Sequence, residues 1–348
     1  MVGPDGTAAE DVMPAWRAGV LGEPAEVLAV AQVPVPVPGP GEVLVEVRAA
    51  ALNFPDVLLC RGQYQERPPL PFTPGIELCG VVRAAGDGVG SAAGDGTAVA
   101  VGQRVIGPVV LPYGALARYA LCRASDLHPA PPELDDACAA ALHIAYQTAW
   151  FALHRRAGLR AGEWLLVNAA AGGVGSAAVQ LGRAAGARVI GVVGGAGKVA
   201  SAEQAGADVV IDRSTQDVVS RVKELTGGRG VDVVFDPVGG DSFAAATKVI
   251  GFEGRIVVIG FAGGTIAQAA TNHLLVKNYS VVGLHWGLYR SKNPDLIRQA
   301  HDELRRLVSS GVVRPLIGER VGFTDAAQAL ARLAAGRTVG RVAVLPPA

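Results

Sequence analysis

A glycine-rich turn between an apolar strand and a helix of small residues constrains this chain more than any other segment. Residues 164–175 read Trp-Leu-Leu-Val-Asn-Ala-Ala-Ala-Gly-Gly-Val-Gly, and a helix is predicted over 176–186. Ala170, Gly172 and Gly175 occupy the three positions of a G-x-G-x-x-G pattern, which permits a tight bend, close approach of amides to a pyrophosphate, and close helix–strand packing. Small residues also serve ordinary strand-to-helix turns, so the context decides. With the positive helix N-terminus, the turn predicts a dinucleotide site.

The end of the next predicted strand indicates which dinucleotide binds. That strand covers 188–193 and is followed by Gly194, nineteen residues beyond Gly175. A protein that binds NAD usually has Asp or Glu near this position to hold the ribose 2′-hydroxyl. Gly194 has no carboxylate, and Lys198 just beyond it suits a 2′-phosphate. The sequence therefore predicts NADPH rather than NADH.

The length and charge of the chain restrict its class. At 348 residues it exceeds what one hydrophobic core normally supports, so two domains are expected. Acidic and basic residues are equal in number, which argues against nucleic acid or an anionic membrane as a partner. The uncharged window 164–182 contains Asn168, Ser176, Gln180 and several glycines, a poor surface for lipid, so we expect a soluble protein.

The cysteines and the N-terminus predict a cytoplasmic location. Four cysteines show no C-x-x-C spacing, and no secretory signal precedes them, as expected of reduced thiols in the cytoplasm. Residues 1–13 are expected to form a disordered extension.

Two kinds of pattern divide the chain. Residues 15–128 contain short alternating strands, which indicate a mostly β, barrel-like module with a glycine- and alanine-rich, mobile insertion at 86–102. A long helix is predicted over 137–156, and strands then alternate with helices, as in a parallel, doubly wound sheet. The predicted strands are 164–168, 188–193, 209–212, 231–236, 255–260 and 279–286. Amphipathic helices over 294–309 and 325–335 and a strand over 342–345 follow.

Three segments carry a resemblance to a known family: 52–64 with 71–80, 168–180, and 336–342, the last reading Gly-Arg-Thr-Val-Gly-Arg-Val. On these motifs the chain resembles the zinc-free quinone oxidoreductase (zeta-crystallin-like) branch of the medium-chain dehydrogenases. The resemblance implies an α/β fold in which both chain ends build a GroES-like β-barrel domain. Its expected limits are 14–142 and 287–348, with an inserted Rossmann domain, a doubly wound parallel sheet, over 143–286.

The resemblance also implies that no metal is bound. Asn53 stands where zinc-dependent relatives have their first cysteine ligand, Ile76 replaces the histidine ligand, and no cysteine occurs over 141–148. A catalytic zinc needs three protein ligands. His143 and His154 lie roughly 16 Å apart if they share one helix, so isolated histidines are expected on helix surfaces or in the core.

Family analogy assigns the cofactor contacts. Lys198 and Arg213 are expected at the 2′-phosphate, although relatives often have tyrosine at the position of Arg213. Thr148, together with Ile259, Gly260 and Phe261 after the fifth strand, is expected near the nicotinamide. The pyrophosphate contacts are expected from Ala171, Gly172, Gly173, Val174 and Gly175, with Gly194 at the ribose.

Three polar residues are candidates for the catalytic side of the cleft. Asn53, which is also assigned to the cofactor site, is expected to donate to a carbonyl oxygen as it gains charge. Tyr64 is expected to orient or protonate the product. Asp56 is more often structural in this motif. Some relatives have a tyrosine two residues after this aspartate, where this chain has Leu58.

Without zinc there is no strong Lewis acid to generate an alkoxide, so hydride transfer from NADPH to a quinone or an α,β-unsaturated carbonyl fits better than alcohol oxidation. Two alternatives stay open: an enoyl-thioester reductase and a non-catalytic NADPH-binding protein.

The apolar strand 279–286 at the end of the parallel series predicts a homodimer, because relatives pair this edge across a two-fold axis.

Overall fold

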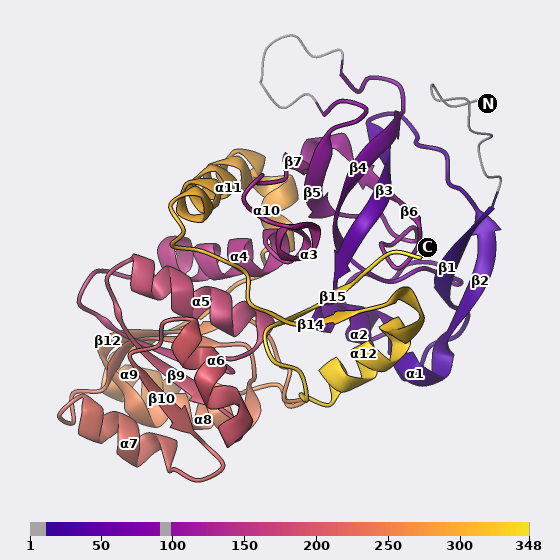
Figure 1. The fold of residues 1–348 in the computed structure, drawn as a ribbon. Coiled ribbons are helices and arrows are strands. Elements are labelled where there is room, and N and C mark those ends of the chain that lie inside the picture. The colour runs from indigo at the N-terminus through magenta and orange to yellow at the C-terminus, as the bar shows by residue number, and fades with distance from the viewer. Residues whose placement is uncertain (1–11, 91–98, 348) are drawn as a thin grey trace. The chain divides into compact units, whose positions relative to one another are not determined.

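The computed structural model describes residues 12–90 and 99–347, which divide into two compact units (Figure 1). The first unit contains the described residues up to Ile144 together with those from Ile317 onward. The second unit is Ala145–Leu316. The expected α/β fold, a barrel-like domain from both chain ends with a parallel-sheet domain inserted between them, is confirmed.

A seven-stranded sheet organises the first unit, in the order β14-β15-β3-β4-β5-β7, with β6 also paired to β3. The long strand β3 (Glu42–Ala51) pairs antiparallel with β4, β6 and β15. Its pairing with β15 joins Ala50 to Val344, so the two ends of the chain share one sheet. The other strands are β4 (Glu77–Ala85), β5 (Arg104–Pro108), β6 (Tyr119–Arg123), β7 (His128–Pro129), β14 (Ile317–Val321) and β15 (Arg341–Val344).

A separate two-stranded sheet opens the described chain. It pairs β1 (Val12–Ala18) with β2 (Leu28–Pro34). The expectation of a disordered extension over 1–13 is therefore wrong for Val12 and Met13, because Met13 is buried against Ala15 and Ala117. Residues 1–11 of that extension, and 91–98 of the insertion predicted at 86–102, lie outside the described residues. The unit's helices are α1 (Pro24–Val27), α2 (Phe54–Cys60), α3 (Asp136–Ala140) and α12 (Ala326–Ala334), with short 3-10 turns at 124–126 and 323–325.

The second unit contains a six-stranded parallel sheet in the order β10-β9-β8-β11-β12-β13. Four strands have the predicted bounds: β8 (Trp164–Asn168), β9 (Arg188–Val193), β10 (Val209–Asp212) and β11 (Val231–Asp236). β12 (Ile250–Val258) begins earlier than predicted, and β13 (Ser280–Gly283) is shorter, because the chain turns toward α10 after Gly283. The boundary between the units falls within α4 (His143–Trp150), after Ile144. The helices entirely within the second unit are α5 (Gly173–Ala184), α6 (Val199–Gln204), α7 (Val218–Leu225), α8 (Gly240–Val249), α9 (Thr271–Lys277), α10 (Gly287–Lys292) and α11 (Pro294–Ser309).

The predicted helix 137–156 is interrupted. α3 ends at Ala140, α4 begins at His143, and a π-helical turn covers Phe151–Arg156. The backbone N–H of Ile144 donates to the Glu77 carboxylate (2.8 Å), so a side chain of β4 lies at the start of α4.

Residues 287–316 belong to the second unit, whereas the sequence placed them with the barrel. The amide of Gln147 in α4 donates to the Ile297 carbonyl of α11 (3.1 Å) and accepts from the indole of Trp286 (3.2 Å). Gln180 of α5 donates to the carbonyl of Arg314 (2.9 Å). The amphipathic pattern of α11 predicts that one of its faces is buried, and these contacts show that it packs within the second unit.

Among the described residues, no helix is both long and apolar enough to cross a bilayer.

Candidate active site

The glycine turn between β8 and α5 needs glycine at one position more than at the others. Ala169 has a positive φ of 52°, and the helix begins at Gly173, directly after the extended Gly172. A Cβ on Gly175 would lie 2.1 Å from the Ala169 carbonyl oxygen, which no side chain tolerates, whereas one on Gly172 would lie 3.2 Å from it. Gly175 therefore permits the close packing of helix on strand, and the first amides of α5 are left at the carboxyl edge of the sheet.

Gly194 and Arg213, which follow β9 and β10, are brought together. A Cβ on Gly194 would lie 3.1 Å from Nη2 and 3.2 Å from Nε of Arg213, so the guanidinium packs against the bare face of this glycine. The Arg213 backbone N–H donates to the Val193 carbonyl (3.0 Å). Lys198 ends the 3-10 turn Ala196–Lys198 and is half-buried. A positive group thus covers the position where an NAD-binding protein has a carboxylate.

Asp212 organises this corner, and sequence reasoning missed it. Its Oδ1 accepts from the backbone N–H of Gly195 (2.8 Å), the backbone N–H of Ser214 (3.0 Å) and the Ser214 hydroxyl (2.7 Å). The pKa of Asp212 is lowered, and the hydrogen bonds from Ser214 are the main cause. Its carboxylate is therefore turned into the loops. An acid at the end of a parallel strand was the available signal.

The strand order reverses between β8 and β11, where doubly wound sheets bind their ligands. The Asn168 amide at the end of β8 donates to Asp236 at the end of β11 (3.1 Å). Asp236 also accepts from the backbone N–H groups of Val238 (3.2 Å) and Gly239 (3.3 Å), and its burial raises its pKa. The hydrogen bond between Asn168 and Asp236 fixes the two loops that flank this point of reversal.

The residues predicted after the fifth strand lie beside that point. The Ile259 backbone N–H donates to the Asp236 carbonyl (2.9 Å). Phe261 is 39% exposed, and its ring packs so closely on Gly239 that a Cβ there would lie 2.9 Å from Cδ1. Gly260 connects them. Thr148 is half-buried on α4.

In the first unit, Asn53 belongs to a buried polar cluster, here called the Asn53 cluster, with Asp56, Glu77 and Arg341. The Asn53 amide donates to the Ala51 carbonyl (3.1 Å) and to the Glu77 carboxylate (3.0 Å), and its oxygen accepts from Arg341 (2.7 Å). Arg341 also forms an ion pair with Glu77. Both amide hydrogens of Asn53 are thus engaged inside the unit, so it positions its surroundings and has no hydrogen left to donate to a substrate carbonyl.

Asp56 has the structural geometry that its motif favours. Its carboxylate accepts from the backbone N–H groups of Asn53 (2.8 Å), Gly75 (2.8 Å) and Ile76 (3.1 Å). Complete burial raises the pKa of Asp56 to about 6. Tyr64 is half-buried and packs against the barrel core. The sequence missed the roles of Glu77 and Arg341, although both lie in the motifs that carried the resemblance.

The Asn53 cluster does not fit a zinc ion. Zinc sites use thiolate, imidazole or carboxylate ligands. Here the carboxylate of Glu77 is occupied by Arg341, Asn53 and the backbone of Ile144, and the guanidinium brings a positive charge that would repel a cation. His128 and His143, expected to be isolated, are neighbours with ring centroids 5.2 Å apart, and both are buried.

The chain matches two family models: "Alcohol dehydrogenase GroES-like domain" over 39–132 and "Zinc-binding dehydrogenase" over 173–302. Quinone oxidoreductase-like protein 2 of Bos taurus is 38% identical over 329 residues, which are 94% of this chain and 91% of that protein. Mycobacterial Rv1454c complexed with NADPH has a TM-score of 0.87 and 33% identity, covering 96% of this chain and 100% of that one. Escherichia coli quinone oxidoreductase complexed with NADPH has a TM-score of 0.86 and 30% identity, with the same coverage.

Proposed function

The chain belongs to the quinone oxidoreductase branch of the medium-chain dehydrogenases, and on this premise we propose that it is an NADPH-dependent reductase of quinones or other electron-poor conjugated carbonyls. The observation that carries the proposal is the contact between Arg213 and Gly194. It puts a cation where a carboxylate would select NADH, and two structural relatives are complexed with NADPH.

Residues of the second unit fit the cofactor in separate parts. The first amides of α5, at Gly173 to Gly175, face the carboxyl edge and suit the pyrophosphate. Arg213 and Lys198 suit the 2′-phosphate, with Asp212 holding the Gly194–Gly195 loop in place. Ile259 to Phe261 and Thr148 suit the nicotinamide side.

When bound, NADPH would supply a hydride, and the protein would supply position and hydrogen bonds. The hydrogen bond between Asn168 and Asp236 fixes the loops on both sides of the switch point. In the first unit, the Asn53 cluster fixes the start of α2, and Tyr64 remains the candidate to orient a product. Because the cluster does not fit zinc, an acceptor that needs no Lewis acid is favoured.

The experiment that tests this function measures NADPH oxidation with 1,4-benzoquinone, 9,10-phenanthrenequinone and crotonyl-CoA, each corrected for the rate without protein. Faster NADPH oxidation with the two quinones than with crotonyl-CoA would support the proposal. Turnover of crotonyl-CoA alone would identify an enoyl-thioester reductase instead. Saturable NADPH binding without turnover of any acceptor would identify a non-catalytic binding protein.

We also propose a homodimer joined through β13. Among the described residues, β13 pairs with β12 on one side and ends the sheet. Val281 and Val282 are only half-buried there, and Leu275 and Val276 on the preceding helix are each 77% exposed. An apolar sheet edge is normally covered or paired.

A cytoplasmic location is proposed because all four cysteines are free thiols.

A further inference from the structure

A cavity lies at the amino edge of the parallel sheet, the edge opposite the loops proposed to bind the cofactor. Its volume is about 390 Å³. It lies where β11 and β12 begin, next to the last turns of α7, α8 and α9. The six residues of β11 span roughly 20 Å, so this cavity is distinct from the loops that follow the strands.

Four cations line this cavity: Lys223, Arg229, Lys248 and Lys277. The side chains of Lys223 and Lys248 make no hydrogen bond or close ion pair with any residue that the structure describes, although the charges of both help to lower the pKa of Asp217. Lys277 donates only to the Thr247 carbonyl (2.9 Å). Burial and the nearby charge of Lys223 lower the pKa of Lys277. One lysine per helix end complements the helix dipole, but three ammonium groups facing one cavity repel one another.

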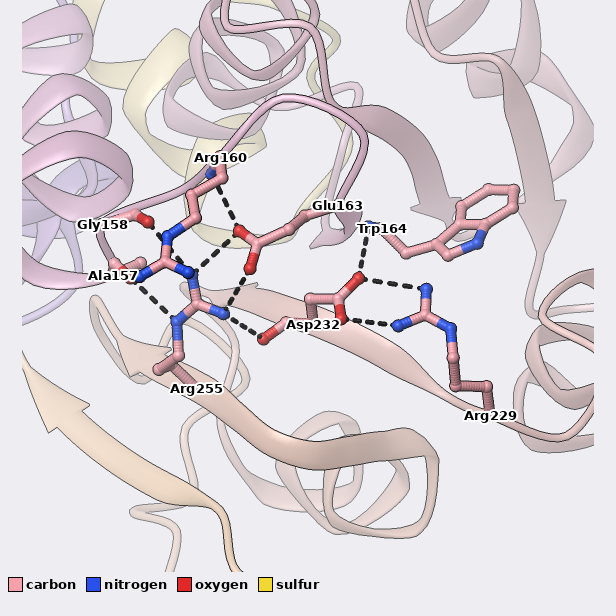
Figure 2. A network of polar contacts seen from close by, with 8 residues as sticks. All are labelled: Ala157, Gly158, Arg160, Glu163, Trp164, Arg229, Asp232 and Arg255. Carbon is pink, nitrogen blue, oxygen red and sulfur yellow. Dashed lines mark hydrogen bonds and ion pairs between the residues drawn. The ribbon is translucent and has the colours of Figure 1, made fainter.

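Arg229 is held in place by the polar network shown in Figure 2. The two terminal nitrogens of Arg229 donate hydrogen bonds to the Asp232 carboxylate (2.7 and 3.2 Å), which also accepts from the Trp164 backbone N–H (2.7 Å). This pairing neutralises Arg229, whereas none of the described carboxylates forms an ion pair with the three lysines, and Asp217 interacts with Lys223 and Lys248 only at longer range. The same edge is braced by Arg255, which pairs with Glu163 (2.9 Å). Asp232 therefore holds Arg229 in place, and the residues that line the cavity include lysines but no acid.

An aromatic ring also lines the cavity. Phe252 is 73% exposed and is one of the residues that line the cavity. Exposed aromatic faces stack well on nucleobases. The volume lies within the range of small-molecule sites, so a ligand larger than one phosphate is accommodated.

We propose that this amino-edge cavity binds a nucleoside polyphosphate, with Lys223, Lys248 and Lys277 at the phosphates and Phe252 against the base. The charge requires an anion, the number of lysines favours more than one phosphate, and the ring favours a nucleoside over inorganic phosphate. This site does not depend on the proposed reductase function.

Calorimetric titrations with tripolyphosphate, ATP and adenosine, run with and without saturating NADPH, test the proposal. We expect ATP and tripolyphosphate to bind in both conditions, and adenosine to bind weakly. The double variant Lys223→Gln/Lys248→Gln should bind both anions roughly tenfold or more weakly. Phe252→Ala should weaken ATP alone, and the matched control Lys292→Gln on α10 should change nothing.

Binding of tripolyphosphate that NADPH abolishes, or that the double variant retains, would overturn the site. Equal binding of ATP to Phe252→Ala and to the parent would overturn the nucleoside part. A measurement on the parent protein avoids any folding defect of the variants. Tripolyphosphate should protect Lys223 and Lys248, but not Lys292, from reductive methylation followed by mass spectrometry. Uniform labelling with and without the anion would contradict the proposal.

Discussion

Arg341 and Glu77, which are 264 positions apart in the sequence, form an ion pair inside the first unit, where their side chains are 4% and 0% exposed. The pair also holds Asn53 through both ends of its amide. Burial raises the pKa of Glu77, and the charge of Arg341 acts in the opposite direction. The Asn53 cluster is therefore held together by a buried cationic side chain.

Removing one partner of this pair should be costly. Arg341→Met leaves a buried carboxylate without its counter-charge, so we expect a loss of about 3–5 kcal/mol in the free energy of unfolding. Arg320→Met is the matched control, because its pair with Asp135 is 45% and 49% exposed and worth under about 1 kcal/mol. Urea unfolding of both variants measures the contrast. The double variant Glu77→Gln/Arg341→Met should recover part of the loss, and equal effects of the two single variants would contradict the assignment.

Asp56 should make stability depend on pH in an unusual direction. Its pKa is about 6 in the folded chain against an ordinary 3.8, so the folded state binds the proton more tightly. Its stabilising contribution is present below about pH 4 and is lost as the pH rises through 6. The two pKa values differ by an amount worth roughly 3 kcal/mol. The free energy of unfolding of the parent minus that of Asp56→Asn should fall between pH 4 and 7 by up to this amount; a constant difference would refute it.

Cofactor preference should follow the Gly194 corner. Gly194→Asp puts a carboxylate against the Arg213 guanidinium, and Lys198→Ala or Arg213→Ala removes a cation. Each should reduce the ratio of NADPH to NADH affinity by roughly ten- to a hundredfold. Fluorescence titration with both nucleotides measures the ratio. Arg183→Ala is the control, since this 60% exposed arginine pairs with Asp208. Equal affinity of the parent for the two nucleotides would show that the corner does not select.

Two glycines of the first turn should differ in their tolerance of a methyl group. Gly175→Ala places Cβ 2.1 Å from the Ala169 carbonyl oxygen, so the helix must move and NADPH binding should fall at least about tenfold. Gly172→Ala places Cβ at 3.2 Å with an ordinary φ of −86°, so a smaller effect is expected. Dissociation constants and melting temperatures of both variants check the order. The reverse order would contradict the role given to Gly175.

The oligomeric state should depend on the edge strand. Sedimentation of the parent should give twice the 35.5 kDa chain mass. Val282→Asp introduces a charge on β13 and should yield monomers that keep their NADPH affinity. Val312→Asp, at a 49% exposed position in the same unit, should leave the mass unchanged. A monomeric parent would rule out the dimer, and a dimeric Val282→Asp would place its interface elsewhere.

Local patterns determined much of this protein. Short apolar runs bounded by turn residues predicted the bounds of β8, β9, β10 and β11, because a buried parallel strand is a local hydrophobic segment. The glycine-rich turn predicted a dinucleotide site at the carboxyl edge of the sheet. That signal is also local, because backbone freedom and small size are properties of single residues. The family resemblance added that both chain ends build one sheet, as the pairing of Ala50 with Val344 shows.

Only the tertiary structure decided which side chains meet. The sequence presented Asn53 as a free amide donor, but Glu77 and Arg341 engage it from 24 and 288 positions away. It placed α11 with the barrel, whereas Gln147 holds that helix in the second unit. A periodic pattern specifies that a face is buried and leaves open what covers it. Hydrogen-bond partners distant in the chain depend on three-dimensional packing, so no local signal could assign them.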